Sequence, residues 1–415
     1  MSPERLTERL EALAPGAWEL YFKQGISREI RRAARDVSET FRSEEGLAAR
    51  WWDPAPRFAA AGDEASLAGA IERARESPVS PGTLPSWPTG AAPAPELVAA
   101  EPPPDVHEEL ARLVAAESRG EATLTELTVR SGRTIERVVN AAGLDVAWSA
   151  GARTGFAAAV GRRGARACEA RVPFRWDGAP DLPSLARRLC DRATLPLSDR
   201  AAPVERGDWL LEPSVAAALL AGLAPLFCRE RSARWAARGG LLAPEISIVD
   251  DAGSDAPFDG EGTRTRRVVV FEKGGLGLPL RDLAAARRDG AFSTGHGVRP
   301  SYRTPPGLGA RRLFFETERP APPRELLAGV RRGLFASALI APWRCDLEND
   351  RYEAEFTGIA VVAGHAQGPV SSARSRGRLS ELLRRITALA PAAEAFPSPE
   401  PVVGATVLVE RVSFD

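Results

Sequence analysis

Residues 258–278 read FDGEGTRTRRVVVFEKGGLGL, with a glycine-bearing turn on either side of a β-branched run. The consecutive valines predict a short packed strand, because β-branched side chains suit a pleated surface. The flanking glycines predict tight turns that require positive φ. GGLG at 274–277 lacks the GxGxxG spacing of a dinucleotide site, and GxxxxGK[ST] occurs nowhere in the chain. We therefore interpret the stretch as a turn, a strand and a second turn, and not as a phosphate-binding loop.

The whole chain has the length and balance of a folded protein with more than one domain. It has 415 residues, 44% of them hydrophobic and 27% charged, which excludes a disordered chain. Its 55 basic and 55 acidic residues give zero net charge, so neither nucleic acid nor a membrane is predicted as a partner. Four cysteines without CxxC spacing favour reduced thiols, and residues 1–13 contain no apolar signal segment. We expect a cytoplasmic protein.

Residues 1–200 are predicted to form an N-terminal α/β domain with an antiparallel meander. A proline-rich loop at 77–104 interrupts this domain. Asp63 is placed to cap the predicted helix at 64–76. The predicted helices are 3–13, 64–76, 105–118 and 182–192; the predicted strands are 18–23, 27–34, 37–42 and 46–52, with more in 121–172.

Residues 201–415 are predicted to form a mostly-β, barrel-like domain around one buried helix. That helix, SVAAALLAGLAPLF at 214–227, is apolar nearly all round, which indicates burial on every side. The other predicted elements are strands 245–249, 265–272, 310–316, 354–365 and 405–412, and helices 323–333 and 378–390. Strands grouped apart from helices indicate the α+β class, with the domain boundary near 195–206.

No constellation of residues predicts chemistry in this chain. The three histidines, His107, His296 and His365, lie too far apart for an HExxH zinc motif. No GxSxG occurs, and Cys345 has no histidine nearby in sequence. Acidic residues around the opening stretch are interpreted as mostly solvated loop side chains: Asp250, Asp251, Asp255, Asp259 and Glu261. We therefore predict no catalytic residue and no metal ligand.

The opening stretch, followed by LRDLAAARRDGAFSTGHGVRP, resembles the TldD/PmbA family. In that family Asp-x-Glu-Gly-Thr-x-Thr precedes a strand and a glycine turn, and a helix then leads to Ser-Thr-Gly-Asn. Two further stretches are similar to the family's plan: AWELYFKQGISREI…VSETFRSEEGLAARWW near the front and FTGIAVVAGHAQGPVSSARSRGRLSELLRRITALAP near the end. The resemblance extends over nearly the whole chain.

The resemblance implies a division of labour between two related subunits. The TldD type resembles a zinc metallopeptidase, with His-Glu-x-x-x-His on a mid-chain helix and a later cysteine ligand; the TldE (PmbA) type shares the fold without these ligands. Here the corresponding helix, 214–227, has neither histidine nor glutamate, and no cysteine follows Leu389. The resemblance therefore implies a TldE-type subunit with no cofactor of its own, paired in a heterodimer with a TldD-like subunit that carries zinc.

The expected function is that of a non-catalytic subunit in a metallopeptidase complex that processes or degrades small, unfolded or modified peptides. Contacts along the peptide path are predicted at Glu261, Gly262, Thr263, Arg264 and His296. His296 stands where the family has the asparagine of Ser-Thr-Gly-Asn. One alternative is a stand-alone peptide-binding or assembly protein, as a homodimer; another is an enzyme that uses His296, Cys345 and the acidic residues. The family's label as a gyrase modulator implies DNA, which the neutral charge does not support.

Overall fold

A computed structural model gives the fold of the chain. It describes residues 3–33, 36–53, 55–76, 84–93, 103–176, 178–199, 206–227, 235, 240–252, 256–392, 394–396 and 402–414. Most of the predicted proline-rich loop and residues 200–205 of the predicted boundary lie outside these ranges. The α+β class is confirmed.

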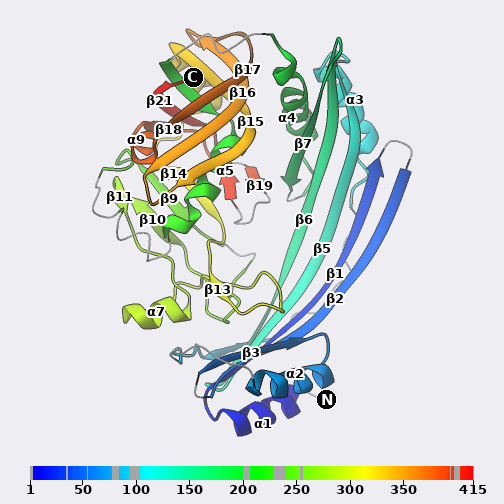
Figure 1. The fold of residues 1–415 in the computed structure, drawn as a ribbon, viewed down its shortest axis with the longest axis vertical. Coiled ribbons are helices and arrows are strands. Elements are labelled where there is room, and N and C mark those ends of the chain that lie inside the picture. Colours follow the sequence, from blue (N-terminus) through cyan, green and yellow to red (C-terminus); the bar gives the residue numbers. More distant parts are fainter. Residues whose placement is uncertain are drawn as a thin grey trace.

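A curved, seven-stranded half-barrel sheet dominates the N-terminal half (Figure 1). Its order is β3-β2-β1-β5-β6-β4, and β7 pairs with β6. The strands are β1 (Trp18–Ala33), β2 (Asp36–Trp52), β3 (Pro56–Ala61), β4 (Gly90–Ala92), β5 (Ala122–Asn140), β6 (Leu144–Arg163) and β7 (Arg166–Arg175).

The four short strands predicted at the front are wrong, because β1 and β2 are two long strands in one hairpin. Their ladder is continuous from Trp18 opposite Trp51 to Ala33 opposite Asp36. Gly25, at a predicted break, lies inside this ladder, where an added Cβ would stand 3.2 Å from the Thr134 hydroxyl. The glycine therefore permits a close approach of strands instead of a turn.

Four helices cover the two ends of this sheet. They are α1 (Pro3–Leu13), α2 (Glu64–Glu76), α3 (His107–Glu117) and α4 (Leu182–Thr194). Helices α1 and α2 lie at one end, and α3 and α4 at the other (Figure 1). Asp63 caps α2 as predicted, since its carboxylate accepts from the Ser66 backbone N–H at 2.8 Å. All four predicted helices are confirmed, with small shifts at their ends.

Two six-stranded sheets build the C-terminal half. Their orders are β17-β16-β15-β8-β21-β18 and β11-β10-β9-β14-β20-β19. The strands are β8 (Arg206–Leu211), β9 (Ile246–Asp250), β10 (Val268–Glu272), β11 (Gly275–Leu276), β14 (Leu313–Thr317), β15 (Arg332–Asp346), β16 (Arg351–Val362), β17 (His365–Arg378), β18 (Ile386–Leu389), β19 (Glu394–Phe396), β20 (Val402–Gly404) and β21 (Val407–Ser413). Helix α5 (Pro213–Leu223) packs on β15 of one sheet and on β14 and β20 of the other. The predicted buried central helix is confirmed.

The smaller elements of this half are short helices and one small hairpin. They are η2 (Ala224–Phe227), α7 (Leu283–Asp289), α8 (Pro323–Gly329), α9 (Leu379–Arg384), β12 (Gly297–Val298) and β13 (Gly307–Leu308). The helix predicted at 378–390 is wrong beyond Arg384, because Ile386 starts β18 and pairs with Val409. The strand predicted at 354–365 ends at Val362, where Ala363 and Gly364 turn the chain with positive φ.

Among the described residues the two halves meet at several places, one of which is the contact of β7 with β19. Helix α4 packs on β15 and β16, while the loops around β12 and β13 reach the lower part of the curved sheet (Figure 1). No helix among the described residues is both long and apolar enough to cross a membrane.

Candidate functional site

Helix α5 stands where the family resemblance would put a zinc-binding helix, and its side chains do not fit a zinc ion. The helix presents Val, Ala and Leu side chains, all of them buried except Ala218 and Ala221, which are partly buried. At its N-terminus Glu212 accepts from the Ser214 backbone N–H at 2.8 Å. The described residues contain no group of three His, Cys, Asp or Glu side chains that could hold a metal ion. Such a helix contributes packing and offers no ligand atoms.

Cys345 packs directly on α5 at Gly222. A Cβ added to that glycine would stand 2.9 Å from the cysteine sulfur. Burial raises the pKa of the Cys345 thiol to about 11. The group is therefore a neutral thiol at physiological pH, whereas a nucleophile would need the thiolate.

The loop at 258–264 is held by one buried carboxylate. The Oδ1 atom of Asp259 accepts from the backbone N–H groups of Glu261 and Thr263, each at 2.9 Å. Its Oδ2 atom accepts from the backbone N–H of Gly297 at 2.8 Å, which ties the loop to β12. Asp259 is fully buried. The loop is therefore held in one conformation by hydrogen bonds to its own aspartate, as in an Asx turn.

Apolar contacts join this loop to the curved sheet. Phe258 and Tyr302 from the C-terminal half pack on a cluster in the sheet: Tyr21, Ala48, Val138, Leu144, Val146 and Trp148. Two glycines permit the close approach. A Cβ on Gly262, whose φ is 73°, would stand 2.4 Å from the Leu144 side chain, and one on Gly46 would stand 2.4 Å from the Tyr302 ring.

A chain of four alternating charges crosses the same junction. Arg50 of β2 bonds to the Glu261 carboxylate at 2.9 Å and to Glu19 of β1 at 2.8 Å. The second oxygen of Glu19 pairs with Arg299, whose guanidinium lies 4.6 Å from the centre of the Tyr21 ring. None of the four charged side chains is more than 11% exposed. We name Glu19, Arg50, Glu261 and Arg299 the junction network.

Burial shifts the pKa values of three charged groups at the junction toward their neutral forms. Burial, and then the nearby Glu261 charge, raise the pKa of Asp259 to about 7. Burial also raises the pKa of Glu261, although the Arg50 cation opposes the shift. Burial lowers the pKa of Arg299, while Glu19 opposes it. The ionised groups are therefore kept in place only because each carboxylate has paired or hydrogen-bonded partners.

His296 belongs to a second buried pair close to the loop. Its Nε2 lies 3.1 Å from Asp250 Oδ1, and its Nδ1 lies 2.8 Å from the Thr294 hydroxyl. Asp250 also accepts from the Arg311 backbone N–H at 2.8 Å. The interpretation of the local acidic residues as solvated is wrong for three of them, which are buried: Asp250, Asp259 and Glu261. Asp255 lies outside the described residues.

The structure brings the five predicted peptide-path residues into one region. Glu261, Gly262, Thr263 and Arg264 share the loop at 258–264, and His296 precedes the glycine that the loop's aspartate binds. Glu261, Gly262 and His296 are buried, Thr263 is half-buried and Arg264 is exposed. Their role along a peptide path stays a prediction.

Sequence reasoning missed Glu19, Arg50 and Arg299. For Glu19 and Arg50 the available signal was a charged residue inside an otherwise apolar stretch, WELYF and ARWW respectively. Such a residue in a packed strand needs a partner of opposite charge. The partners stand 211 and 280 residues away along the chain, and no local pattern points to them.

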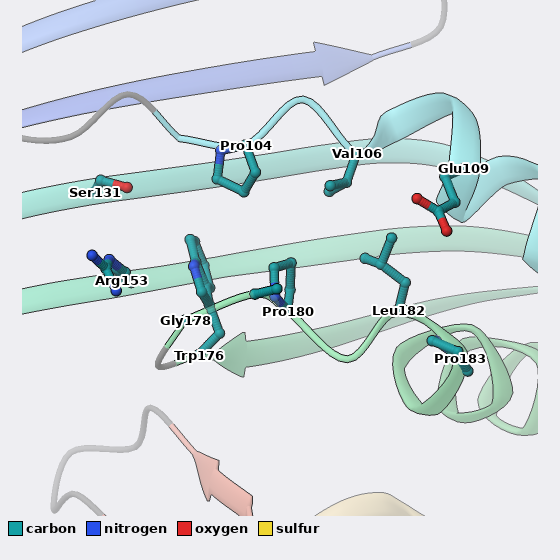
Figure 2. A pocket seen from close by; sticks show the side chains of 11 residues that line it. Pro104, Val106, Glu109, Ser131, Arg153, Trp176, Gly178, Pro180, Leu182 and Pro183 are labelled. Carbon is teal, nitrogen blue, oxygen red and sulfur yellow. The ribbon is translucent and has the colours of Figure 1, made fainter.

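A pocket of about 470 Å³ opens between α3, the sheet and the loop that leads into α4 (Figure 2). Strands β5 and β6 contribute Ser131 and Arg153 to it. Trp176 follows β7, and Glu109 comes from α3. A volume of this size is typical of sites for small ligands.

Comparisons with known proteins agree with this geometry. Residues 208–415 match the family model of the PmbA/TldA metallopeptidase C-terminal domain. No curated protein sequence matches the chain. Among solved structures, TldE from Thermococcus kodakarensis superposes with a TM-score of 0.84 at 19% identity, over 99% of both chains.

Two further solved structures have the same fold. A proposed modulator of DNA gyrase from Thermotoga maritima MSB8 gives a TM-score of 0.79 at 18% identity, over 100% of both chains. Another, from Bacteroides thetaiotaomicron VPI-5482, gives 0.77 at 16% identity, over 99% of this chain and 98% of that one. Identities this low show a shared fold alone. The family model, in contrast, matches half of the sequence, and the chain therefore belongs to the PmbA/TldD family of metallopeptidase-related proteins.

Proposed function

We propose that this chain is a non-catalytic, TldE-type subunit of a heterodimeric zinc metallopeptidase that processes or degrades small, unfolded or modified peptides. The observation that carries the proposal is α5: a helix of Val, Ala and Leu fills the core between the two C-terminal sheets. The partner, a TldD-like subunit, would supply the zinc and the cleavage. This chain would contribute shape and peptide contacts, in the cytoplasm.

The junction network supports a shaping role. Its four charges link β1 and β2 of the half-barrel to two loops of the C-terminal half. Buried ion pairs of this kind are weak sources of stability but specify one arrangement, because alternatives leave a charge unpaired. A fixed angle between the two halves would let this subunit form one side of an enclosed space in which the partner cleaves peptides.

A free sheet edge supports contact with an extended chain. Among the described residues, β3 pairs only with residues 47–52 of β2, which leaves residues 36–46 without a partner on that side. Phe41 and Val37 on this segment are 67% and 59% exposed. An extended peptide or a partner strand can add to such an edge through backbone hydrogen bonds.

The test is co-expression of this chain with a TldD-type relative, followed by size-exclusion chromatography, zinc analysis and a peptide-degradation assay. One complex is expected, with zinc on the partner and activity only when both chains are present. As a control, a partner with its zinc-motif histidines replaced by alanine should still join the complex but degrade nothing. Separate elution of the two chains, or stoichiometric zinc on this chain purified alone, would contradict the proposal.

A second candidate is a stand-alone peptide-binding or assembly protein that acts as a homodimer. The pocket beside Trp176 favours it, since this chain alone builds that pocket. Peptide binding by a pure homodimer, with no TldD-like partner in the same cell, would select this candidate.

A further inference from the structure

Helix α4 contacts both halves of the molecule, through two different faces. One face packs on the curved sheet with apolar side chains: Leu185, Ala186, Leu189, Cys190 and Ala193. The helix also packs on β15 and β16 of the C-terminal half (Figure 1). Arg188, Asp191 and Arg192 share the other face, because residues three and four apart lie together on a helix. The contact of α4 with the C-terminal half is therefore polar.

A hydrogen bond and a buried carboxylate define the C-terminal side of this contact. The Arg192 guanidinium donates to the Ser214 hydroxyl of α5 at 3.1 Å. Ser214 in turn bonds to Glu212, whose Oε2 atom accepts from the Ser214 backbone N–H at 2.8 Å. Glu212 is 3% exposed, and its buried Oε1 atom has no hydrogen-bond partner among the described residues. A buried acceptor without a partner is costly, and a donor beside it would lower that cost.

Asp191 is the group on α4 that can supply such a donor, when it is protonated. The Ser337 hydroxyl of β15 and the Glu212 charge both act on its carboxyl group. Burial is the largest cause of a rise in the pKa of Asp191 to about 7. The Arg187 cation opposes this rise in pKa, whereas the charges of Glu212 and Glu117 add to it. The Ser337 hydroxyl opposes it as well.

Charged and titratable side chains lie around Asp191 on three sides. On its own helix they are three arginines and one thiol: Arg187, Arg188, Arg192 and Cys190. Arginines keep their charge in proteins, and burial raises the pKa of the Cys190 thiol to about 12, so the thiol stays neutral. Helix α3 contributes Glu117, the segment before α5 contributes Glu212, and β15 contributes the uncharged Ser337. Asp191 is therefore a carboxyl group at this contact whose pKa lies near neutral pH.

We propose that Asp191 makes the contact between α4 and the C-terminal half dependent on protonation. In its neutral form the carboxyl group can donate to the buried Glu212 carboxylate, and one negative charge fewer remains at the contact. In its ionised form it adds a second carboxylate to the field of Glu212, and the contact weakens. Between about pH 4 and pH 7 the docked helix binds more protons than the released helix, so the contact loosens as pH rises through this window. The inference goes beyond the proposed function, because it concerns this chain without a partner.

Hydrogen–deuterium exchange of the full chain at about pH 5, 6 and 7, followed by mass spectrometry, tests the inference. Protection of the α4 backbone amides, corrected for the intrinsic effect of pH on exchange, should fall by up to about tenfold per pH unit, because release of the helix releases one proton. Asp191→Asn cannot titrate, while its amide can still donate to Glu212, so its protection should stay constant over this range. Asp199→Asn is the control: it removes an exposed carboxylate, paired with Arg166, and should keep the wild-type dependence.

Glu212→Gln gives a second test, which decides the matter if circular dichroism shows that Asp191→Asn does not fold. Without the facing carboxylate the ionised form of Asp191 is less unfavourable, so the fall in protection should be smaller than in wild type. Asp259→Asn acts at the other contact between the halves and should leave the dependence at α4 unchanged. Protection that is independent of pH in wild type would overturn the inference. The full wild-type dependence in folded Asp191→Asn, or in Glu212→Gln, would overturn it as well.

Discussion

The core around α5 and the charged groups at the junction around residues 258–264 are both largely buried, yet they are held in opposite ways. In the core, a helix of small and branched apolar residues packs between two sheets. At the junction, charged groups from sequence-distant strands and loops satisfy one another beside a small apolar cluster. Apolar packing tolerates many arrangements, whereas paired buried charges permit very few. The core therefore supplies stability, and the junction fixes how the two halves are oriented.

The largest effect is expected from a charge in the core. Leu219 of α5 is 0% exposed, so Leu219→Glu would bury an unpaired carboxylate. The expected cost exceeds about 4 kcal/mol, enough to prevent folding of the C-terminal half. Thermal unfolding and yield of folded protein measure it. Leu219→Met keeps the volume and should cost less than about 1.5 kcal/mol; a well-folded Leu219→Glu variant would show that α5 is not the core.

The second effect comes from breaking the junction network. Arg50→Met removes the cation between Glu19 and Glu261 and should cost about 3–5 kcal/mol, because the buried Glu261 loses its cation and Glu19 keeps only Arg299. Arg28→Met is the control, since its pair with Glu39 is exposed and should be worth less than about 1 kcal/mol.

Denaturant unfolding compares the two variants directly. The double variant Arg50→Met/Glu261→Gln should recover part of the loss, since one orphaned charge disappears. Equal stability of Arg50→Met and Arg28→Met would mean that the junction is held by its apolar cluster alone.

The difference between the two regions also explains what could be predicted from sequence. The buried helix at 214–227 could be predicted because its apolar residues follow one another along the sequence. The cap at Asp63 was visible for the same local reason. The long hairpin of β1 and β2 was broken into pieces at Gly25, because the pairing that carries the strand through a glycine is not a local property. The junction network was missed entirely, since its ion pairs join residues up to 280 positions apart.

A smaller effect is expected where the two halves touch through glycine. In Gly46→Ala the new methyl would stand 2.4 Å from the Tyr302 ring, and the overpacking should cost about 1–3 kcal/mol. Gly62→Ala, next to the same strand pair, has nothing within 4 Å and should be close to neutral. In a double-mutant cycle, Tyr302→Ala should cancel most of the Gly46→Ala cost, and additive losses would show that the ring does not lie on this glycine.

The smallest effect is a dependence of stability on pH through Asp259. Its pKa is raised to about 7 in the folded protein, so between about pH 4 and pH 7 the folded state binds more protons than the unfolded state. Stability should therefore fall as pH rises through this window, the reverse of ordinary acid denaturation. Three backbone N–H groups bond the carboxylate and favour its charged form, which limits the size of the effect.

Melting temperatures between about pH 5 and pH 8 measure this dependence, with wild type compared against Asp259→Asn. Asparagine cannot titrate, so the variant should lose part of the decline toward high pH even if its overall stability is lower. The comparison uses the slope and not the absolute value, because the new amide group would face the Gly297 N–H and cost stability at every pH. Asp63→Asn is the control. It removes an exposed carboxylate outside the junction and should leave the slope in this window unchanged. Identical slopes in wild type and Asp259→Asn would mean that Asp259 does not cause the pH dependence. Glu261 or Asp191, whose pKa values are also raised by burial, would then be its source.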